Sequence, residues 1–152
     1  MKVRFKFGIK TFSGTADEMT YGSYAKNTLC LGRQYVTPDY TANNQHVGAI
    51  GKNLASVFKA AAAEYVADLK TYATRNGKEN FHYGELAVTA YPLFVKMMFA
   101  WAKTDPTHID LTAITVADIV TRDADVRTVK RAVDAGYLPH ISDYADLTSD
   151  IQ

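Results

Sequence analysis

The first ten residues, MKVRFKFGIK, alternate between apolar and basic side chains and limit the chain to one local structure there. The apolar set is Val3, Phe5, Phe7 and Ile9, and the basic set is Lys2, Arg4, Lys6 and Lys10. Only an extended strand, whose successive side chains point to opposite faces, separates these two sets. We therefore predict an opening β-strand with one face in a core and the other carrying four cations.

Two more strands are predicted, one at residues 20–24, which are rich in Thr and Tyr, and one at residues 28–36. Asn27, which tolerates a left-handed conformation, lies in the short connection between them, so the two strands read as a β-hairpin. Gly22 and Gly32 fall inside the paired strands and mark either a bulge or a close backbone approach. Ser13-Gly14 predicts a turn or loop after the first strand. A sheet of three strands has two open edges, which need covering by a helix or by another chain.

A long helix is predicted from a cap within Thr41–Asn44 to a stop at Asn76-Gly77. Gly48 and Gly51 either fray its start or let another backbone pack closely. A break inside the alanine run 60–63 is left open. Pro92, in the first turn, opens a second helix that is apolar nearly all round, so this helix is either buried centrally or packed against a neighbouring subunit.

Shorter elements are predicted for the rest of the chain. Thr115 caps one short helix, and Asp123 or Asp125 caps a last helix that Gly136 closes. The segment from residue 142 to 152 carries apolar side chains at loose helical spacing and is either a docked arm or a frayed end.

These elements predict an α+β fold. A small antiparallel N-terminal sheet of about three strands, residues 1–40, packs on a bundle of three to four helices, residues 41–152. A chain of 152 residues fits a single domain with a core that needs no disulfides.

Charge is distributed unevenly, although the whole chain carries a net charge of only +1. Residues 1–36 hold six Lys/Arg against two acids, a net charge of +4, whereas residues 104–152 hold nine Asp against four Lys/Arg, a net charge of −5. Either the two ends meet inside one fold, or the basic end of one copy meets the acidic end of the next.

The sequence lacks the residue patterns of common catalytic and cofactor sites. The four histidines are far apart, and Cys30 is a lone cysteine in an apolar run, which is typical of a small buried thiol. Asp123 and Asp125 have the spacing of a calcium loop without its other ligands, so capping explains them better. No glycine-rich phosphate loop or nucleophile motif occurs. We therefore expect no enzymatic activity, metal, cofactor or small-molecule ligand.

The N-terminus lacks the apolar core of a signal peptide, and no apolar stretch is long enough to span a membrane. We expect synthesis in the cytoplasm without a signal peptide and no membrane partner. Any virion or extracellular assembly would then use a route without a cleaved signal.

A set of short motifs between residues 8 and 75 resembles small phage- or prophage-associated bacterial proteins of uncharacterised function. The motif residues, in order, are Ser13-Gly14, Thr20-Tyr21, Arg33, Tyr35-Val36, Pro38, Thr41-Ala42, Asn43 or Asn44, Leu69 and Tyr72-Ala73. Those proteins similarly begin with a glycine-punctuated hairpin and continue through an extended segment into helices. The resemblance implies a structural or assembly role and assigns no functional residue.

Together these features predict a non-enzymatic structural subunit that self-associates into an oligomer or polymer, such as a filament, tube or virion component. The candidate self-association residues are Val3, Phe5, Phe7, Tyr21, Tyr24, Tyr35, Met97, Met98 and Trp101. The alternative is an accessory protein that binds polyanions or nucleic acid through the basic face, Lys2, Arg4, Lys6 and Lys10. Nucleic acid is the less favoured partner, because Phe5 and Phe7 point away from the cations. The opening strand is expected to pair within its own chain rather than with another copy.

Overall fold

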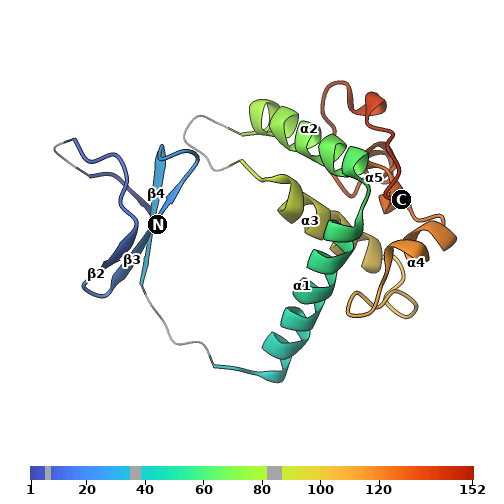
Figure 1. The fold of residues 1–152 in the computed structure, drawn as a ribbon, viewed down its shortest axis with the longest axis horizontal. Coiled ribbons are helices and arrows are strands. Elements are labelled where there is room, and N and C mark those ends of the chain that lie inside the picture. Colours follow the sequence, from blue (N-terminus) through green and yellow to red (C-terminus); the bar gives the residue numbers. More distant parts are fainter. Residues whose placement is uncertain (6–7, 35–38, 82–86) are drawn as a thin grey trace. The chain divides into compact units, whose positions relative to one another are not determined.

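The protein forms two compact units in a computed structural model (Figure 1). The structure describes residues 1–5, 8–34, 39–81 and 87–152. Residues 1–40 form a sheet unit, and the described residues from 41 onward form a helical unit. The boundary lies where the sequence predicts the change from strands to helices, and the α+β fold class is confirmed. That the two units make up one domain stays a prediction.

The sheet unit is a four-stranded antiparallel sheet in the order β1-β4-β3-β2. Its strands are β1 (Lys2–Val3), β2 (Gly14–Ala16), β3 (Met19–Tyr24) and β4 (Leu29–Gln34). β3 and β4 pair along their whole length, from Met19 opposite Gln34 to Tyr24 opposite Leu29. The predicted hairpin is therefore confirmed, and Asn27 adopts the expected left-handed conformation, with φ of 64°.

The prediction of about three strands is wrong by one, because β2 lies where a loop was expected. β2 pairs with β3 through a two-residue turn at Asp17-Glu18, in which Asp17 has a φ of 55°. The three residues of β2, Gly14–Ala16, are all exposed, and their side chains do not alternate between apolar and polar. A short edge strand of this composition is indistinguishable from a loop until its neighbour is known.

The opening strand pairs within its own chain, as expected, but is shorter than predicted. Lys2 lies opposite Leu31 and Val3 opposite Cys30, and the Gly32 amide donates to the Met1 carbonyl at 2.8 Å. The next two partners toward the chain's own turn would be Leu29, the first residue of β4, and then Thr28, which belongs to the turn. In this register β4 offers β1 only one further partner beyond Cys30, so β1 stops near the end of β4 although its alternating sequence continues.

The helical unit contains five α-helices and two short 3₁₀-helices among the described residues. They are α1 (Ala42–Ala60), α2 (Ala63–Glu79), α3 (Ala90–Ala102), α4 (Val116–Thr121), η1 (Asp125–Arg127), α5 (Val129–Asp134) and η2 (Tyr144–Asp146). Thr41 caps α1 and Thr115 caps α4, both as predicted. The count exceeds the predicted three to four, because one predicted long helix is two.

The chain breaks between α1 and α2 at Ala61-Ala62, inside the alanine run. Both residues have extended backbone angles, and the Ala62 amide donates to the Ile151 carbonyl at 2.9 Å. Alanine favours helix at every position of this run. The hydrogen bond to Ile151, which is distant in the sequence, therefore determines where α1 ends, and the local sequence does not determine it.

This break makes Ala63→Pro a stabilising substitution. Ala63 is the first residue of α2, where a missing N–H costs nothing, and Ala62 already has the extended conformation that precedes proline. We expect the free energy of unfolding to rise by about 0.4–1 kcal/mol. Ala67→Pro, at an exposed position inside the same helix, should instead lower it by about 3 kcal/mol. Urea denaturation followed by circular dichroism measures both, and equal destabilisation would show that the helix is continuous.

α3 is the central helix of the unit, contacted by α1, α2 and η1. Met97 and Met98 are fully buried in the core, and Trp101 is 6% exposed. Of the two roles predicted for this apolar helix, the structure gives it the buried one. The prediction that Met97, Met98 and Trp101 form a self-association surface is therefore wrong.

Two predicted helix ends are also wrong, for tertiary reasons. α2 continues past Asn76-Gly77 to Glu79; Asn76 is buried, and a Cβ on Gly77 would lie 3.0 Å from the Ala87 methyl. Gly77 thus permits packing and does not cap the helix. Thr128 caps α5, and neither predicted aspartate does.

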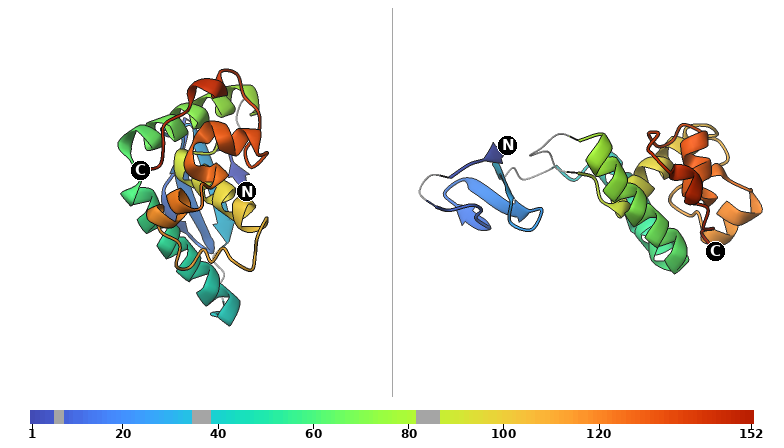
Figure 2. Two further views of the ribbon diagram at one scale, coloured as in Figure 1. Left: turned by 90° about the vertical axis from the view of Figure 1, so that its right-hand side faces the viewer. Right: turned by 90° about the horizontal axis from the view of Figure 1, so that it is seen from above.

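The C-terminal segment is a docked arm. Ile141, Leu147 and Ile151 are buried in the core, and the Ser149 amide donates to the Asp68 carboxylate of α2 at 3.0 Å. Figure 2 shows this segment lying against α2 and α5. No helix among the described residues is both long and apolar enough to cross a membrane.

Candidate interaction surface

The two faces of the sheet carry different chemistry, and their side chains can be assigned from the strand register. Directly paired residues of an antiparallel sheet share a face, and successive residues alternate between faces. Tyr21 pairs with Gly32 and Gly14, whereas Leu31 pairs with Lys2 and Gly22. These two rows belong to opposite faces.

The first face, called the aromatic face below, consists of Val3, Phe5, Phe12 and Tyr21. The Tyr21 ring lies between the Phe5 and Phe12 rings, with centroids 5.8 Å from each. It also covers Gly32, where an added Cβ would lie 2.9 Å from Val3 and 3.2 Å from Tyr21. Gly32 therefore marks a close approach. The cluster is thin, since Phe12 remains 41% exposed and Ile9 remains 56% exposed.

The second face, called the cation face below, consists of Lys2, Arg4, Arg33, Tyr24, Leu29 and Leu31. Lys2, Leu31 and Gly22 form one row, and Leu29 and Tyr24 form the next. The Tyr24 ring covers Gly22, where an added Cβ would lie 2.9 Å from the ring, and the Arg33 guanidinium donates to the Tyr24 hydroxyl at 3.2 Å. Gly22 and Gly32 are thus each covered by a tyrosine, on opposite faces.

The predicted site residues within the strands and beside them separate into two groups. Val3, Phe5 and Tyr21 come together on the aromatic face, while Lys2, Arg4 and Tyr24 lie on the cation face. Lys10 is exposed and lies outside the strands. Phe7, Tyr35 and Lys6 lie outside the described residues.

Two residues that matter for these faces were not predicted, Phe12 and Arg33. Phe12 follows the turn at Gly8 and lies two residues before an edge strand that looks like a loop in the sequence. Arg33 joins Lys2 only because β1 pairs with β4. The register of the predicted hairpin, which puts Arg33 opposite Thr20, is the signal that places Arg33 and Tyr24 on one face.

The acidic C-terminal residues are used inside the helical unit. Asp123 accepts bonds from Arg127 at 3.0 Å and Arg131 at 2.8 Å, Asp125 pairs with Arg131, and Asp150 pairs with Arg127. The bonds from Arg131 hold the pKa of Asp123 below its ordinary value. Asp118 closes the capping box of α4, and the Tyr144 hydroxyl donates to Asp134 at 2.9 Å. Capping is therefore wrong for Asp123 and Asp125, which together with Asp150 pair with arginines of the same unit.

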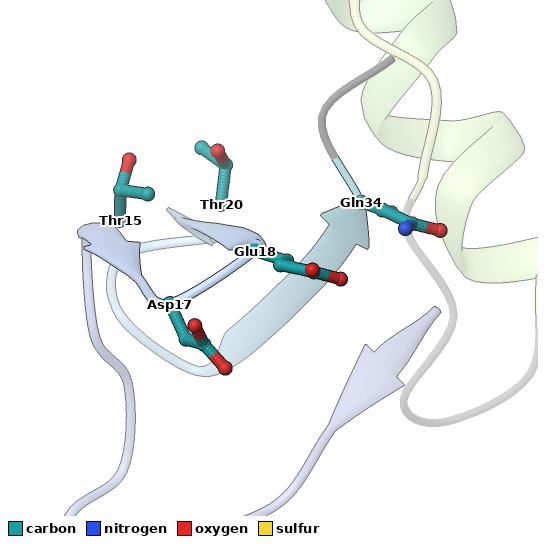
Figure 3. A pocket seen from close by; sticks show the side chains of 5 residues that line it. All are labelled: Thr15, Asp17, Glu18, Thr20 and Gln34. Atoms are coloured by element: carbon teal, nitrogen blue, oxygen red, sulfur yellow. The ribbon is translucent and has the colours of Figure 1, made fainter.

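A hollow of about 510 Å³ lies beside the β2–β3 turn, lined by Thr15, Asp17, Glu18, Thr20 and Gln34. In Figure 3 the threonines stand on one side, while the acidic side chains and Gln34 point in other directions. Side chains that do not converge make no cradle for a small molecule.

The described residues contain no group of three or more His, Cys, Asp or Glu placed to hold a metal ion. His46, His108 and His140 are exposed, and His108 bonds Asp105 at 2.9 Å. His82 lies outside the described residues. Cys30 is buried, as predicted for a structural thiol.

No protein-family model, no curated protein sequence and no solved structure matches this chain.

Proposed function

We propose that the protein is a non-enzymatic structural subunit whose copies associate through the aromatic face of the sheet unit. The observation that carries this proposal is the exposure of that face. Within the described part of the sheet unit only Cys30 and Gly32 are buried, while Phe12 and Ile9 face solvent. Aromatic side chains at protein interfaces supply large contact areas at low entropic cost.

A second copy is the occupant that the chemistry of this face favours. Val3, Phe5, Phe12 and Tyr21 carry no charge, so two such faces can meet without burying an unpaired ion. An isologous contact of this kind needs only one patch that is complementary to itself. Phe12 also precedes β2, an outer strand of the sheet with no described strand on its far side. Strand addition at that edge would extend a dimer into a polymer.

The apolar helix α3 and the acidic C-terminal residues do not contribute to this proposal. The helix is buried in the core of the helical unit, and Asp123, Asp125 and Asp150 pair with arginines within that unit. Self-association therefore rests on the sheet unit alone.

Light scattering coupled to size exclusion tests the proposal on the full chain over a range of concentrations, with electron microscopy of the same samples. We expect a mass above that of the monomer. Phe12→Lys should return the protein to a monomer, because it places a charge in the apolar contact. Phe99→Lys is the matched control, since Phe99 is an aromatic residue of the helical unit that is 36% exposed.

Ile9→Lys provides a second variant in case Phe12→Lys disturbs the packing of Tyr21. Ile9 is a 56% exposed apolar residue in the segment that joins Phe5 to Phe12, so a charge there should dissociate the assembly and leave the far-ultraviolet circular dichroism spectrum unchanged. A wild-type protein that stays monomeric at high concentration, or an assembly that survives both substitutions, would exclude this face as the contact.

A further inference from the structure

The cation face combines positive charge with an aromatic ring, whereas the alternation of the first ten residues places the aromatic rings Phe5 and Phe7 opposite the cations. Phe5 belongs to the opposite face, but Tyr24 does not. It shares its face with Lys2, Arg4 and Arg33, and Arg33 bonds its hydroxyl.

The position of the Tyr24 ring follows from a glycine beneath it. Gly22 has no side chain, and an added Cβ would lie 2.9 Å from Cε2 and 3.4 Å from Cζ of the ring. The ring therefore rests against the backbone of β3 on one side. Tyr24 is 37% exposed, so part of the ring remains open to solvent. Arg33 holds the hydroxyl end in place, which limits the entropy lost when a ligand stacks on the ring.

The charges around this ring are mostly positive. Lys2, Arg4 and Arg33 are exposed on the same face, and exposed Lys26 lies in the turn that follows Tyr24. The acids of the described sheet strands and turns, Asp17 and Glu18, lie at the opposite end of β3, in the β2–β3 turn. A polyanion would thus meet cations on the β1 and β4 side of Tyr24.

We infer that the cation face binds single-stranded nucleic acid, with a base stacked on Tyr24 and phosphates held by Lys2, Arg4 and Arg33. Single strands expose both the base face and the phosphates, and proteins bind them with aromatic rings flanked by cations on a sheet. A duplex keeps its bases stacked on one another, so it can use the charges but not the ring. This inference uses the face opposite to the proposed self-association contact and does not depend on that contact.

Fluorescence anisotropy with a short labelled oligothymidylate, and with a labelled duplex of the same length, tests the inference. We expect the single strand to bind more tightly than the duplex, with an affinity that falls as salt rises. Tyr24→Ala should weaken single-strand binding about 5- to 150-fold, which corresponds to the loss of one stacked base. Tyr40→Ala is the matched control, because Tyr40 is 80% exposed and lies outside the strands.

Two further variants separate stacking from charge. Gly22→Ala keeps every ligand-contacting group but displaces the Tyr24 ring, so it should weaken single-strand binding and leave duplex binding unchanged. Arg33→Gln should lower the salt dependence of log affinity by about one phosphate contact. Circular dichroism of each variant checks that the sheet is retained.

The inference is overturned if the oligothymidylate does not bind at low salt. It is also overturned if duplex and single strand bind equally and Tyr24→Ala changes neither, since the face would then attract polyanions by charge alone.

Discussion

Ile151→Ala is expected to lower the free energy of unfolding of the helical unit by about 2–5 kcal/mol, although it changes the penultimate residue of the sequence. The Ile151 side chain is fully buried among the core residues of the unit. Removing three of its carbon atoms leaves a cavity that the surrounding helices fill only in part.

The backbone of Ile151 explains why the segment cannot simply detach. Its amide donates to the Arg127 carbonyl at 3.0 Å, and its carbonyl accepts from Ala62, at the break between α1 and α2. Asp150, beside it, pairs with Arg127. Partial burial of Asp150 raises its carboxyl pKa, but the bonds from Arg127 outweigh this and keep that pKa below its ordinary value.

Urea denaturation monitored by circular dichroism measures the loss. Gln152→Ala is the control, because Gln152 is exposed and should leave the midpoint unchanged. A loss below about 1 kcal/mol for Ile151→Ala would show that the arm adds little to the core.

Gly32→Val is expected to unfold the sheet unit while leaving the helical unit folded. The first added carbon would lie 2.9 Å from Val3 and 3.2 Å from the Tyr21 ring, and two more carbons follow it. Overpacking of this kind costs about 1–3 kcal/mol. A sheet of some forty residues with almost no buried side chains has little stability to lose, because domains near that size are marginal.

Hydrogen exchange measured residue by residue distinguishes the two units. Amides of β3 and β4 should lose their protection in Gly32→Val, while those of α2 and α3 keep it. Gly22→Ala is the matched comparison on the other face: its new carbon meets the far end of the half-exposed Tyr24 ring, which can move. Loss of protection in both units at once would show that the sheet and the helices unfold together.

Local sequence patterns predicted the starts of two helices and the central hairpin correctly. Thr41 and Thr115 cap helices as expected, and Asn27 turns the hairpin, because each of these roles depends on a side chain and its immediate neighbours. The helix ends were less predictable. Asn76-Gly77 resembles a stop signal, but burial of Asn76 and the contact of Gly77 with Ala87 carry α2 further.

The sequence predicted only part of the candidate interaction surface. The alternation of the first residues correctly separates Val3 and Phe5 from Lys2 and Arg4, since a strand has a period of two wherever it pairs. The sequence did not predict which cations and rings share a face, because Arg33 and Tyr24 join Lys2 through pairing between strands.

The roles of Met97 and Trp101 were also open from the sequence. A helix that is apolar all round is buried either by its own chain or by another chain, and its sequence is the same in both cases.

The sequence by itself determined the α+β class, the two-faced character of the opening strand and the places where most helices begin, since these depend on residues within a few positions of one another. Only the tertiary structure decided that β1 ends after two residues, that α1 and α2 separate at Ala61-Ala62, and that Asp123, Asp125 and Asp150 pair with arginines of their own unit. Each of these outcomes depends on a partner distant in the sequence or on how local segments fold against one another: the end of β4, the Ile151 carbonyl, or the arginines of η1 and α5. Local propensity cannot encode such a contact, because its energy exists only after the chain has folded.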